Sequence, residues 1–572
     1  MIAGAVCALL AVGPVGDRPG DRRECAFDLW DWTAPCADLD QFARWADDLR
    51  GIGFTTIEIS APWRLLEPKP GEYDLSFIGD RLRIAQQLGL SLRVRINSYY
   101  AGATPLWLEC DKWVGPDGGV AMDIPSIDDP RFWARYAPLC TAISRTFRGR
   151  DTEYSPFISV HSELKWSEWW TYDESSLRLW RRCIAAPRPD WLVDAVGDGP
   201  LPERPPVPGP TEGEPDSDPA NIAFIAFRER CWREAVARFV SAIREGDPDA
   251  RIAVPLGESY RSASATMSNL DYRGLSRGAT RVVHSYDFFW HASDDPWYAA
   301  ATVAIFRGIT GLPVSLELDG PNLRDQWGYT DQRLASICAE GLRAGASQKV
   351  ANYSYSTRLP SEWPLLGELS RQAREAGPVP GPAPADETIL YFVSKWTNYR
   401  YRESTEWVHD AQLGAWRALT ERGHRLRAIC EDNLDEPDLA SYRGVYVAFS
   451  PESLMPVSSR AELTRLCEAL PSILETPTVP PKLAGNAPVA VEGRWAGLSV
   501  TSPGLPVGPC DVRAGYSGWR PHARSGDLPL LLAHGPHVVI GYPIGYCSLR
   551  ADDRERHAEA LEWAVRRAFS RK

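Results

Sequence analysis

The stretch Leu312-Pro-Val-Ser-Leu-Glu317 is a short apolar run that ends in one acidic residue. Its apolar and β-branched content is typical of a buried strand, and an acid at the end of such a strand is costly to bury without a purpose. A second run of this kind, Phe157-Ile-Ser-Val-His-Ser-Glu163, also ends in a glutamate. Glu317 follows Glu163 by 154 positions, so only a tertiary fold can bring the two acids together.

Eight segments with this strand-like composition occur before residue 376. Apolar residues with helical spacing separate most of them, and only the link after the fifth segment lacks a clear helix. Eight strands alternating with helices predict an α/β fold, a closed (β/α)8 TIM barrel. The predicted strands are Glu24–Trp32, Phe54–Ser60, Ser91–Tyr100, Phe157–Glu163, Arg251–Glu258, Arg281–Phe289, Leu312–Asp319 and Ser347–Tyr355. The predicted helices are Leu39–Gly51, Ser76–Gly89, Pro130–Arg148, Asn221–Gly246, Pro296–Thr310 and Asp331–Ala344.

At 572 residues the chain is longer than one core normally supports, so we expect a second, smaller domain. We predict a segment of uncertain role at 1–19, the barrel at 20–376, a proline-rich linker at 377–386, and a doubly wound α/β domain with a C-terminal extension at 387–572. Its predicted elements are the strands Thr388–Val393, Gly444–Phe449 and His537–Tyr542 and the helices Asp410–Arg422, Arg460–Leu470 and Asp552–Phe569.

One segment interrupts the barrel pattern. Residues Ala185–Ala220 are dense in prolines and acids, a composition that disfavours helix and strand. We expect this excursion to extend into solvent, with packing over the barrel rim as the alternative.

Composition excludes several classes of function. The net charge of −12, with acids and bases mixed along the chain, disfavours nucleic-acid binding. No run reaches the roughly 18 apolar residues of a membrane helix, so we expect no membrane partner. The apolar N-terminus has no basic residue before it, so a cytoplasmic location is expected, with secretion as the alternative.

The sequence predicts neither a metal site nor a cofactor. The 12 cysteines show no CxxC spacing, so neither a zinc site nor a disulfide framework can be assigned. His284 and His291 lie near each other but lack a third ligand, which favours ordinary loop histidines.

Three glutamates end predicted strands: Glu163, Glu258 and Glu317. Barrel enzymes carry their catalytic residues at the carboxyl ends of the strands. Two carboxylates facing each other across a barrel mouth are the apparatus of a retaining glycosidase. We therefore predict Glu163 and Glu317 as the catalytic pair, with Glu258 in reserve. For Glu163, a salt bridge at the start of the next helix is the structural alternative.

Four neighbouring side chains are candidates for binding a sugar. Trp166 and Trp327 each follow a catalytic candidate and could stack on a sugar ring, or else pack at the rim. Tyr286, at the sixth strand end, could donate a hydrogen bond to a carboxylate, or else belong to the core. Asn97 could orient a hydroxyl group, although a strand-end asparagine often forms a turn.

Several motifs resemble the family 42 glycoside hydrolases, mostly β-galactosidases, or a closely related family of retaining barrel glycosidases. The resemblance spans most of the chain. Its motifs are Ala61-Pro-Trp63-Arg-Leu-Leu-Glu67-Pro-Lys-Pro-Gly71-Glu-Tyr-Asp74, Pro105-Leu-Trp-Leu108, Ser162-Glu163, Ser175-Ser-Leu-Arg178-Leu-Trp180, Val314-Ser-Leu-Glu317, Ala344-Gly-Ala346 and Asp438-Leu-Ala-Ser-Tyr442-Arg-Gly-Val-Tyr-Val447.

This resemblance implies specific roles. Glu163 would be the acid/base and Glu317 the nucleophile of a double displacement on a β-linked glycoside or oligosaccharide. Trp63 and Ser162 would lie in the substrate site. The second domain would be amidotransferase-like and would assemble the chain into a homo-oligomer, a trimer.

Two departures count against galactose specificity. The family has an asparagine before the acid/base, and this chain has Ser162. The family's substrate-reading arginine has no counterpart in Gly118–Pro125. The alternatives are therefore a non-catalytic carbohydrate-binding barrel and a transglycosylase that uses the same two glutamates.

Overall fold

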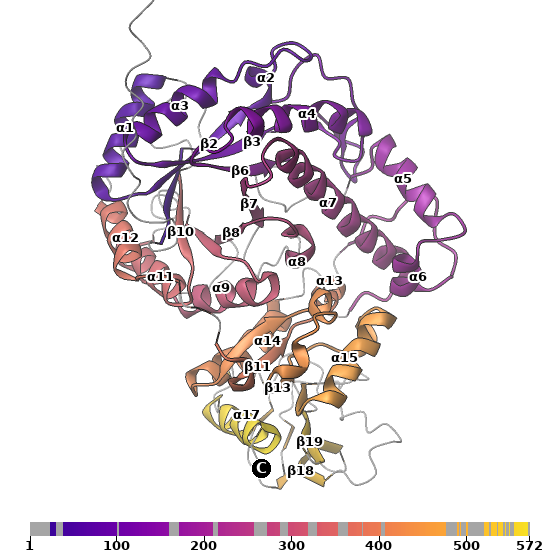
Figure 1. Ribbon diagram of the computed structural model, residues 1–572. Helices are drawn as coiled ribbons and strands as arrows, with labels where there is room; N and C mark the ends of the chain where they lie inside the picture. The colour runs from indigo at the N-terminus through magenta and orange to yellow at the C-terminus, as the bar shows by residue number, and fades with distance from the viewer. Residues whose placement is uncertain are drawn as a thin grey trace, which may run out of the picture.

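The computed structural model describes most of the chain, and it is drawn in Figure 1. The described residues are 23–29, 38–99, 102–158, 171–209, 215–256, 271–286, 296–318, 329–352, 364–379, 381, 383–401, 406–475, 489–490, 492–493, 499–500, 520–525, 528–534, 536–540, 544, 548 and 554–569.

Eight parallel strands close into a barrel, as predicted. Each strand pairs with its neighbour in chain order, and the last pairs with the first, so every register in the barrel is parallel. In order around the barrel the strands are β1 (Cys25–Leu29), β2 (Thr56–Pro62), β3 (Ser91–Asn97), β6 (Thr152–Phe157), β7 (Arg251–Leu256), β8 (Arg281–Tyr286), β9 (Val314–Leu318) and β10 (Ser347–Asn352).

The fourth barrel strand corrects the sequence prediction. We expected Phe157–Glu163, but β6 ends where that segment begins. The strand reads Thr-Glu-Tyr-Ser-Pro-Phe, and its Glu153 contacts Arg93 inside the barrel. The apolar pattern did not identify β6, because the face of this strand that points into the barrel is polar.

Helices surround the barrel in a ring (Figure 1). The first turns of α1 (Leu39–Ile52), α4 (Pro130–Thr146), α7 (Pro219–Gly246) and α11 (Asp331–Arg343) are capped by the side chain that precedes them; before Pro130, for example, Asp129 accepts a hydrogen bond from the Arg131 amide. Between β7 and β8, the described residues form one short helix, α8 (Tyr272–Leu275). The others are α2 (Trp63–Leu66), α3 (Ser76–Gln87), α9 (Trp297–Thr310) and α12 (Pro364–Glu375).

The proline-rich excursion packs against the protein instead of extending into solvent. It follows α5 (Glu174–Ile184) and contains α6 (Asp190–Val196), whose Leu192 is buried. The indole N–H of Trp180 donates to the carbonyl of Pro202 at 2.9 Å, and the Tyr172 hydroxyl donates to that of Pro206 at 2.7 Å. Prolines cannot join a regular ladder, but their free carbonyls accept bonds from the aromatic side chains below.

A second sheet follows the barrel, as expected for a smaller α/β unit. Five parallel strands form its core, and three antiparallel strands extend one edge, an extension that the sequence did not predict. The strands run β12 (Arg425–Ile429), β11 (Thr388–Phe392), β13 (Gly444–Val447), β14 (Ser472–Glu475), β20 (His537–Ile540), β19 (Leu528–His534), β18 (Arg520–Ser525) and β16 (Glu492–Gly493). The longer helices are α13 (Lys395–Tyr401), α14 (Glu406–Glu421), α15 (Val457–Ala469) and α17 (Arg554–Phe569).

The two sheets are joined by direct packing. Helix α9 of the barrel lies on β12, and Gly308 of α9 faces the Ala428 backbone so closely that a Cβ there would lie 2.6 Å from the Ala428 nitrogen. Among the described helices, none has the length and hydropathy needed to cross a bilayer.

Candidate active site at the carboxyl ends of the barrel strands

Glu317 lies one residue before the end of β9, the seventh strand of the barrel. Its side chain is only 5% exposed. Its Oε2 lies 2.8 Å from Nζ of Lys349, which occupies the position opposite Glu317 in the register of the adjacent strand β10. The register of two strands therefore fixes this ion pair.

Lys349 connects Glu317 to other charges inside the barrel. Its Nζ lies 2.9 Å from Oε1 of Glu58 on β2 and 3.7 Å from Oδ2 of Asp28 on β1. Arg95 on β3 forms ion pairs with both of these carboxylates. Side chains from five of the eight strands thus form one ionic layer below the barrel mouth.

A second ionic layer lies nearer the amino ends of the strands. Arg93 contacts Glu24 at 2.9 Å, Glu58 at 2.9 Å and Glu153 at 2.6 Å, and Arg281 contacts Glu24 at 2.7 Å. Barrel interiors usually hold layers of branched aliphatic side chains. Charged layers can replace them here because each buried charge has partners of opposite sign.

The protonation states follow from these contacts. Burial raises the pKa of Asp28 to about 7, with Glu58 and Glu317 adding to the rise against the pull of Arg95 and Lys349. Burial would also raise the pKa of Glu58, but Arg95, Lys349 and Arg93 hold it well below its ordinary value.

Lys349 stays a cation in this surrounding. Burial and Arg95 act to lower the pKa of Lys349, but Glu317, Glu58 and Asp28 raise it above the ordinary value. A lysine that forms a Schiff base needs a lowered pKa. Lys349 is therefore suited to act as the counter-ion of Glu317 and unsuited to act as a nucleophile.

Asn97 ends β3 and is fully buried. Its amide Nδ2 donates to Ser60 Oγ at 3.0 Å, and its Oδ1 accepts from the Tyr99 amide at 3.0 Å. The second bond is the local turn contact that we considered as the alternative role. Asn97 thus stabilises the strand end beside the ionic layer.

Trp63 corrects the expectation that it binds substrate. The ring is fully buried and packs edge-on against Trp107 and Phe132, with centroid distances of 6.0 and 5.8 Å. Its Nε1 donates to Oε2 of Glu67 at 2.7 Å. The indole is fully buried in the protein, so the motif around Trp63 organises a turn at the rim instead of exposing this ring.

The sixth barrel strand, β8, carries both His284 and Tyr286. His284 packs on Phe306 of α9 at a centroid distance of 4.2 Å, and burial lowers the pKa of His284 to about 3, so it is a neutral residue of the core. Tyr286 ends β8 and is in register with Leu318 of β9, directly after Glu317, while its side chain lies outside the described residues. No group of metal-binding side chains occurs in the described part of the chain.

The remaining candidates lie outside the described residues. They are Glu163, Ser162 and Trp166 within 159–170, Trp327 within 319–328, and the reserve candidate Glu258; His291, expected to be an ordinary loop histidine, also lies outside them. Their roles stay predictions from the sequence.

Sequence reasoning missed Asp28, Glu58, Arg95 and Lys349. A signal was present, because Arg93-Leu-Arg95-Ile-Asn97 alternates charged or polar residues with apolar ones. In a strand this period of two gives one polar and one apolar face. In this barrel the polar face of β3 points inward, an arrangement that the sequence prediction did not include.

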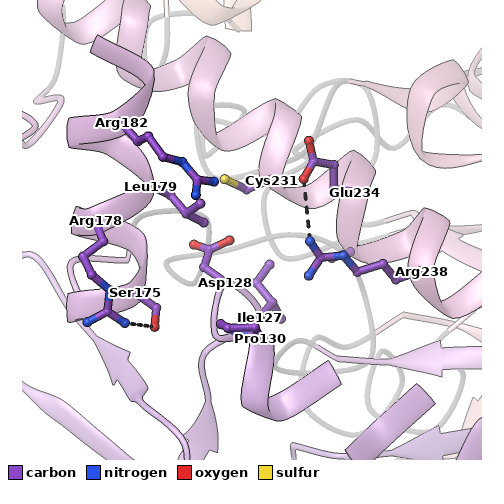
Figure 2. Close-up of a pocket in the computed structure, with 11 residues that line it drawn as sticks. Ile127, Asp128, Pro130, Ser175, Arg178, Leu179, Arg182, Cys231, Glu234 and Arg238 are labelled. Atoms are coloured by element: carbon purple, nitrogen blue, oxygen red, sulfur yellow. Dashed lines mark hydrogen bonds and ion pairs between the residues drawn. The ribbon is translucent and has the colours of Figure 1, made fainter. Parts of the chain in front are cut away.

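A well-defined cavity lies away from this site. It has a volume of about 600 Å³ and lies between the start of α4, α5 and α7. Figure 2 shows Arg178 and Arg182 on the α5 wall and Glu234 and Arg238 on the α7 wall. Its lining residues include none from the barrel strands, so it is not the site around Glu317.

Comparisons with known proteins agree with the fold. No family model and no curated protein sequence matches the chain. A catalytic mutant of a family 42 β-galactosidase from G. stearothermophilus superposes with a TM-score of 0.68 at 11% identity, covering 95% of this chain and 87% of that one. The β-galactosidase from Marinomonas ef1 gives 0.66 at 11% identity, with 95% and 91% covered. An exo-β-1,4-mannosidase from Opitutaceae bacterium strain TAV5 gives 0.57 at 13% identity, with 97% and 98% covered.

These solved structures confirm the expected likeness in fold to family 42 β-galactosidases. The match extends over the second sheet as well as the barrel, because it covers 95% of the chain.

Proposed function

We propose that this chain is a retaining glycoside hydrolase that acts on a β-linked glycoside, with Glu317 as nucleophile and Glu163 as general acid/base. The observation that carries the proposal is the placement of Glu317. It is a buried carboxylate at the carboxyl end of the seventh barrel strand, paired with a cation. That end of a barrel is where catalytic residues collect.

The proposed pair has a suitable topology. Glu163 follows β6, the fourth strand, in the sequence, and Glu317 lies on β9, the seventh, so we expect the two carboxylates to face each other across the barrel mouth. A retaining mechanism needs carboxyl groups about 5–5.5 Å apart with a sugar between them.

The two steps have distinct requirements. Glu317 attacks the anomeric carbon, the bond to the leaving oxygen breaks, and Glu163 transfers its proton to that oxygen. Glu163 then removes a proton from water, which attacks the same carbon and releases Glu317. The ammonium group of Lys349, 2.8 Å from Oε2, is the cationic partner of the carboxylate that the first step uses.

The comparisons support the substrate class. The structures with the same fold include β-galactosidases and an exo-β-1,4-mannosidase, all of which are named for β-linked sugars. The identity of the sugar stays open, because Ser162 stands where the family has an asparagine and residues 118–125 contain no arginine. That segment includes the strand β5 (Val120–Pro125), which forms a hairpin with β4 (Lys112–Val114).

A panel of aryl β-glycosides and α-arabinosides tests the proposal. Wild-type protein is expected to hydrolyse one of them, and Glu317→Ala is expected to lose turnover by at least about 10⁴-fold because the covalent step is gone. Azide added to Glu317→Gly should restore product as a glycosyl azide of inverted configuration. Glu153→Gln is the matched control, because Glu153 is a buried barrel carboxylate that contacts Arg93 and not Lys349. Wild-type turnover by Glu317→Ala would contradict the assignment.

One observation favours a second candidate, a non-catalytic carbohydrate-binding barrel. Glu317 belongs to an ionic network whose other members have structural contacts only, so its ion pair with Lys349 could serve the barrel alone. Calorimetry that detects oligosaccharide binding, with no hydrolysis of the same ligand over days, would support this candidate over the enzyme.

A further inference from the structure

Lys349 is held in place by three carboxylates from three different strands. Glu317 on β9, Glu58 on β2 and Asp28 on β1 lie 2.8, 2.9 and 3.7 Å from its Nζ. The side chain is fully buried, and the strand registers on both sides of β10 fix its backbone. The ammonium group therefore has a defined position relative to Glu317.

The two oxygens of Glu317 are not equivalent in this arrangement. Oε2 is the oxygen nearest the ammonium group, 2.8 Å from Nζ of Lys349, and Oε1 is the one farther from it. A carboxylate held through one oxygen cannot rotate freely about its terminal bond. Its other oxygen is then presented in one direction.

We propose that Lys349 is a positioning residue for the reaction: its ammonium group holds Oε2 of Glu317, so that Oε1 attacks the anomeric carbon. This inference rests on the proposed glycosidase function and adds a residue to it. The groups that face this pair are Asp28 on β1, Glu58 on β2 and Arg95 on β3.

Asp28 supplies a second partner for Lys349 during the reaction. When Oε1 bonds to the anomeric carbon and the leaving group departs with the proton of Glu163, Glu317 becomes a neutral ester. Lys349 then keeps Glu58 and can move toward Asp28, whose Oδ1 is buried without a partner among the described residues. Glu58 is thus an anion available to the ammonium group before and after the covalent step, and Asp28 adds a second oxygen partner.

The test uses an aryl glycoside with a good leaving group, chosen from the panel above, because its cleavage needs little protonation and reports on the nucleophile. In Lys349→Met, kcat/KM on the pH plateau is expected to fall about 100-fold, as a misplaced reacting group does. The acidic limb of the kcat/KM profile is expected to move to higher pH by about one unit or more, because the neighbouring cation is lost.

Three further variants separate positioning from structure. Lys349→Arg keeps the charge and should leave the acidic limb in place. Lys349→Met combined with Asp28→Asn removes the ammonium group together with one of its carboxyl partners, and it replaces the single variant if that one does not fold. Glu153→Gln alters the ionic layer around Arg93 and should leave the acidic limb of the kcat/KM profile unchanged.

The outcomes distinguish this inference from the proposed function. If the wild-type protein cleaves no glycoside of the panel and a 2-deoxy-2-fluoro glycoside labels no residue, the proposed function fails. If the wild type is active and Lys349→Met keeps both its plateau and its acidic limb, Lys349 has no positioning role. An equal shift of the limb in Glu153→Gln would also overturn the inference, because the effect would then belong to the whole network.

Discussion

Asp28 is the residue through which the ionic interior of the barrel responds to pH. Burial raises its pKa to about 7, so the folded state holds a proton that the unfolded chain releases near pH 4. A carboxyl group with a raised pKa gives a stabilisation that is complete below its unfolded value and is lost as the pH rises through its folded value. For Asp28 this window runs from about pH 4 to about pH 7.

We predict that Asp28→Asn flattens the dependence of stability on pH. Between pH 5 and pH 8 the wild-type free energy of unfolding should fall by about 2 kcal/mol more than that of the variant. Urea unfolding of both proteins at the two pH values measures this difference. Glu24 does not interfere, because Arg281 and Arg93 overcome its burial and lower its pKa to about 2, far below this range. Parallel losses in the two proteins would contradict the prediction.

At the scale of the elements, the motif around Trp63 acts as a clamp on the short helix α2. Glu67 accepts from the Trp63 indole at 2.7 Å and from the Gly71 amide at 2.7 Å, while its backbone carbonyl accepts from the Trp107 indole at 3.1 Å. Gly71 has a φ of +79°, so the turn itself needs a glycine. The side chain and the backbone carbonyl of Glu67 together thus join the segments that follow β2 and β3.

We predict that Glu67→Ala lowers the free energy of unfolding by about 1–3 kcal/mol, because it leaves a buried indole N–H and an amide without acceptors. Glu72→Ala is the matched control. Glu72 lies in the same turn and forms an exposed ion pair with Lys69 at 3.3 Å, so its loss should change stability by less than about 0.5 kcal/mol. Equal effects of the two substitutions in urea unfolding would show that the clamp does not contribute.

The whole molecule depends on contacts between the barrel and the second sheet. Lys395 of α13 reaches Glu229 of α7 at 2.9 Å, Asp432 at 2.6 Å and Asp271 at 3.3 Å. These groups are buried or nearly so, which makes them costly to separate. Close packing of α9 on β12 adds to this ionic contact.

We predict that Gly308→Ala weakens this interface. Its new Cβ would lie 2.6 Å from both the nitrogen and the oxygen of Ala428, so α9 and β12 must move apart, at a cost of about 1–3 kcal/mol. Gly367→Ala is the matched control, because Gly367 of α12 has open space around it and should be stabilised by about 1 kcal/mol. Differential scanning calorimetry compares them, and a transition that stays single and unshifted in Gly308→Ala would contradict the prediction.

Seven of the barrel strands overlap the predicted segments well, and the fourth does so only at Phe157. The clearest successes, β2, β3, β7 and β9, carry buried apolar residues such as Ile57, Val94, Val254 and Leu316 on the face opposite the barrel interior. The failure, β6, has polar residues on the inward face and a proline in the strand, both of which weaken the local signal.

The sequence by itself determined the barrel, the second α/β unit and the position of Glu317 at a strand end, because apolar periodicity and strand boundaries are local properties of the chain. Only the tertiary structure decided that Trp63 is a core residue, that the proline-rich excursion packs on the protein, and that Lys349 is the partner of Glu317. Lys349 and Glu58 are 291 residues apart. Their contact arises from the registers of strands that meet when the barrel closes, and no local pattern in the sequence contains those registers.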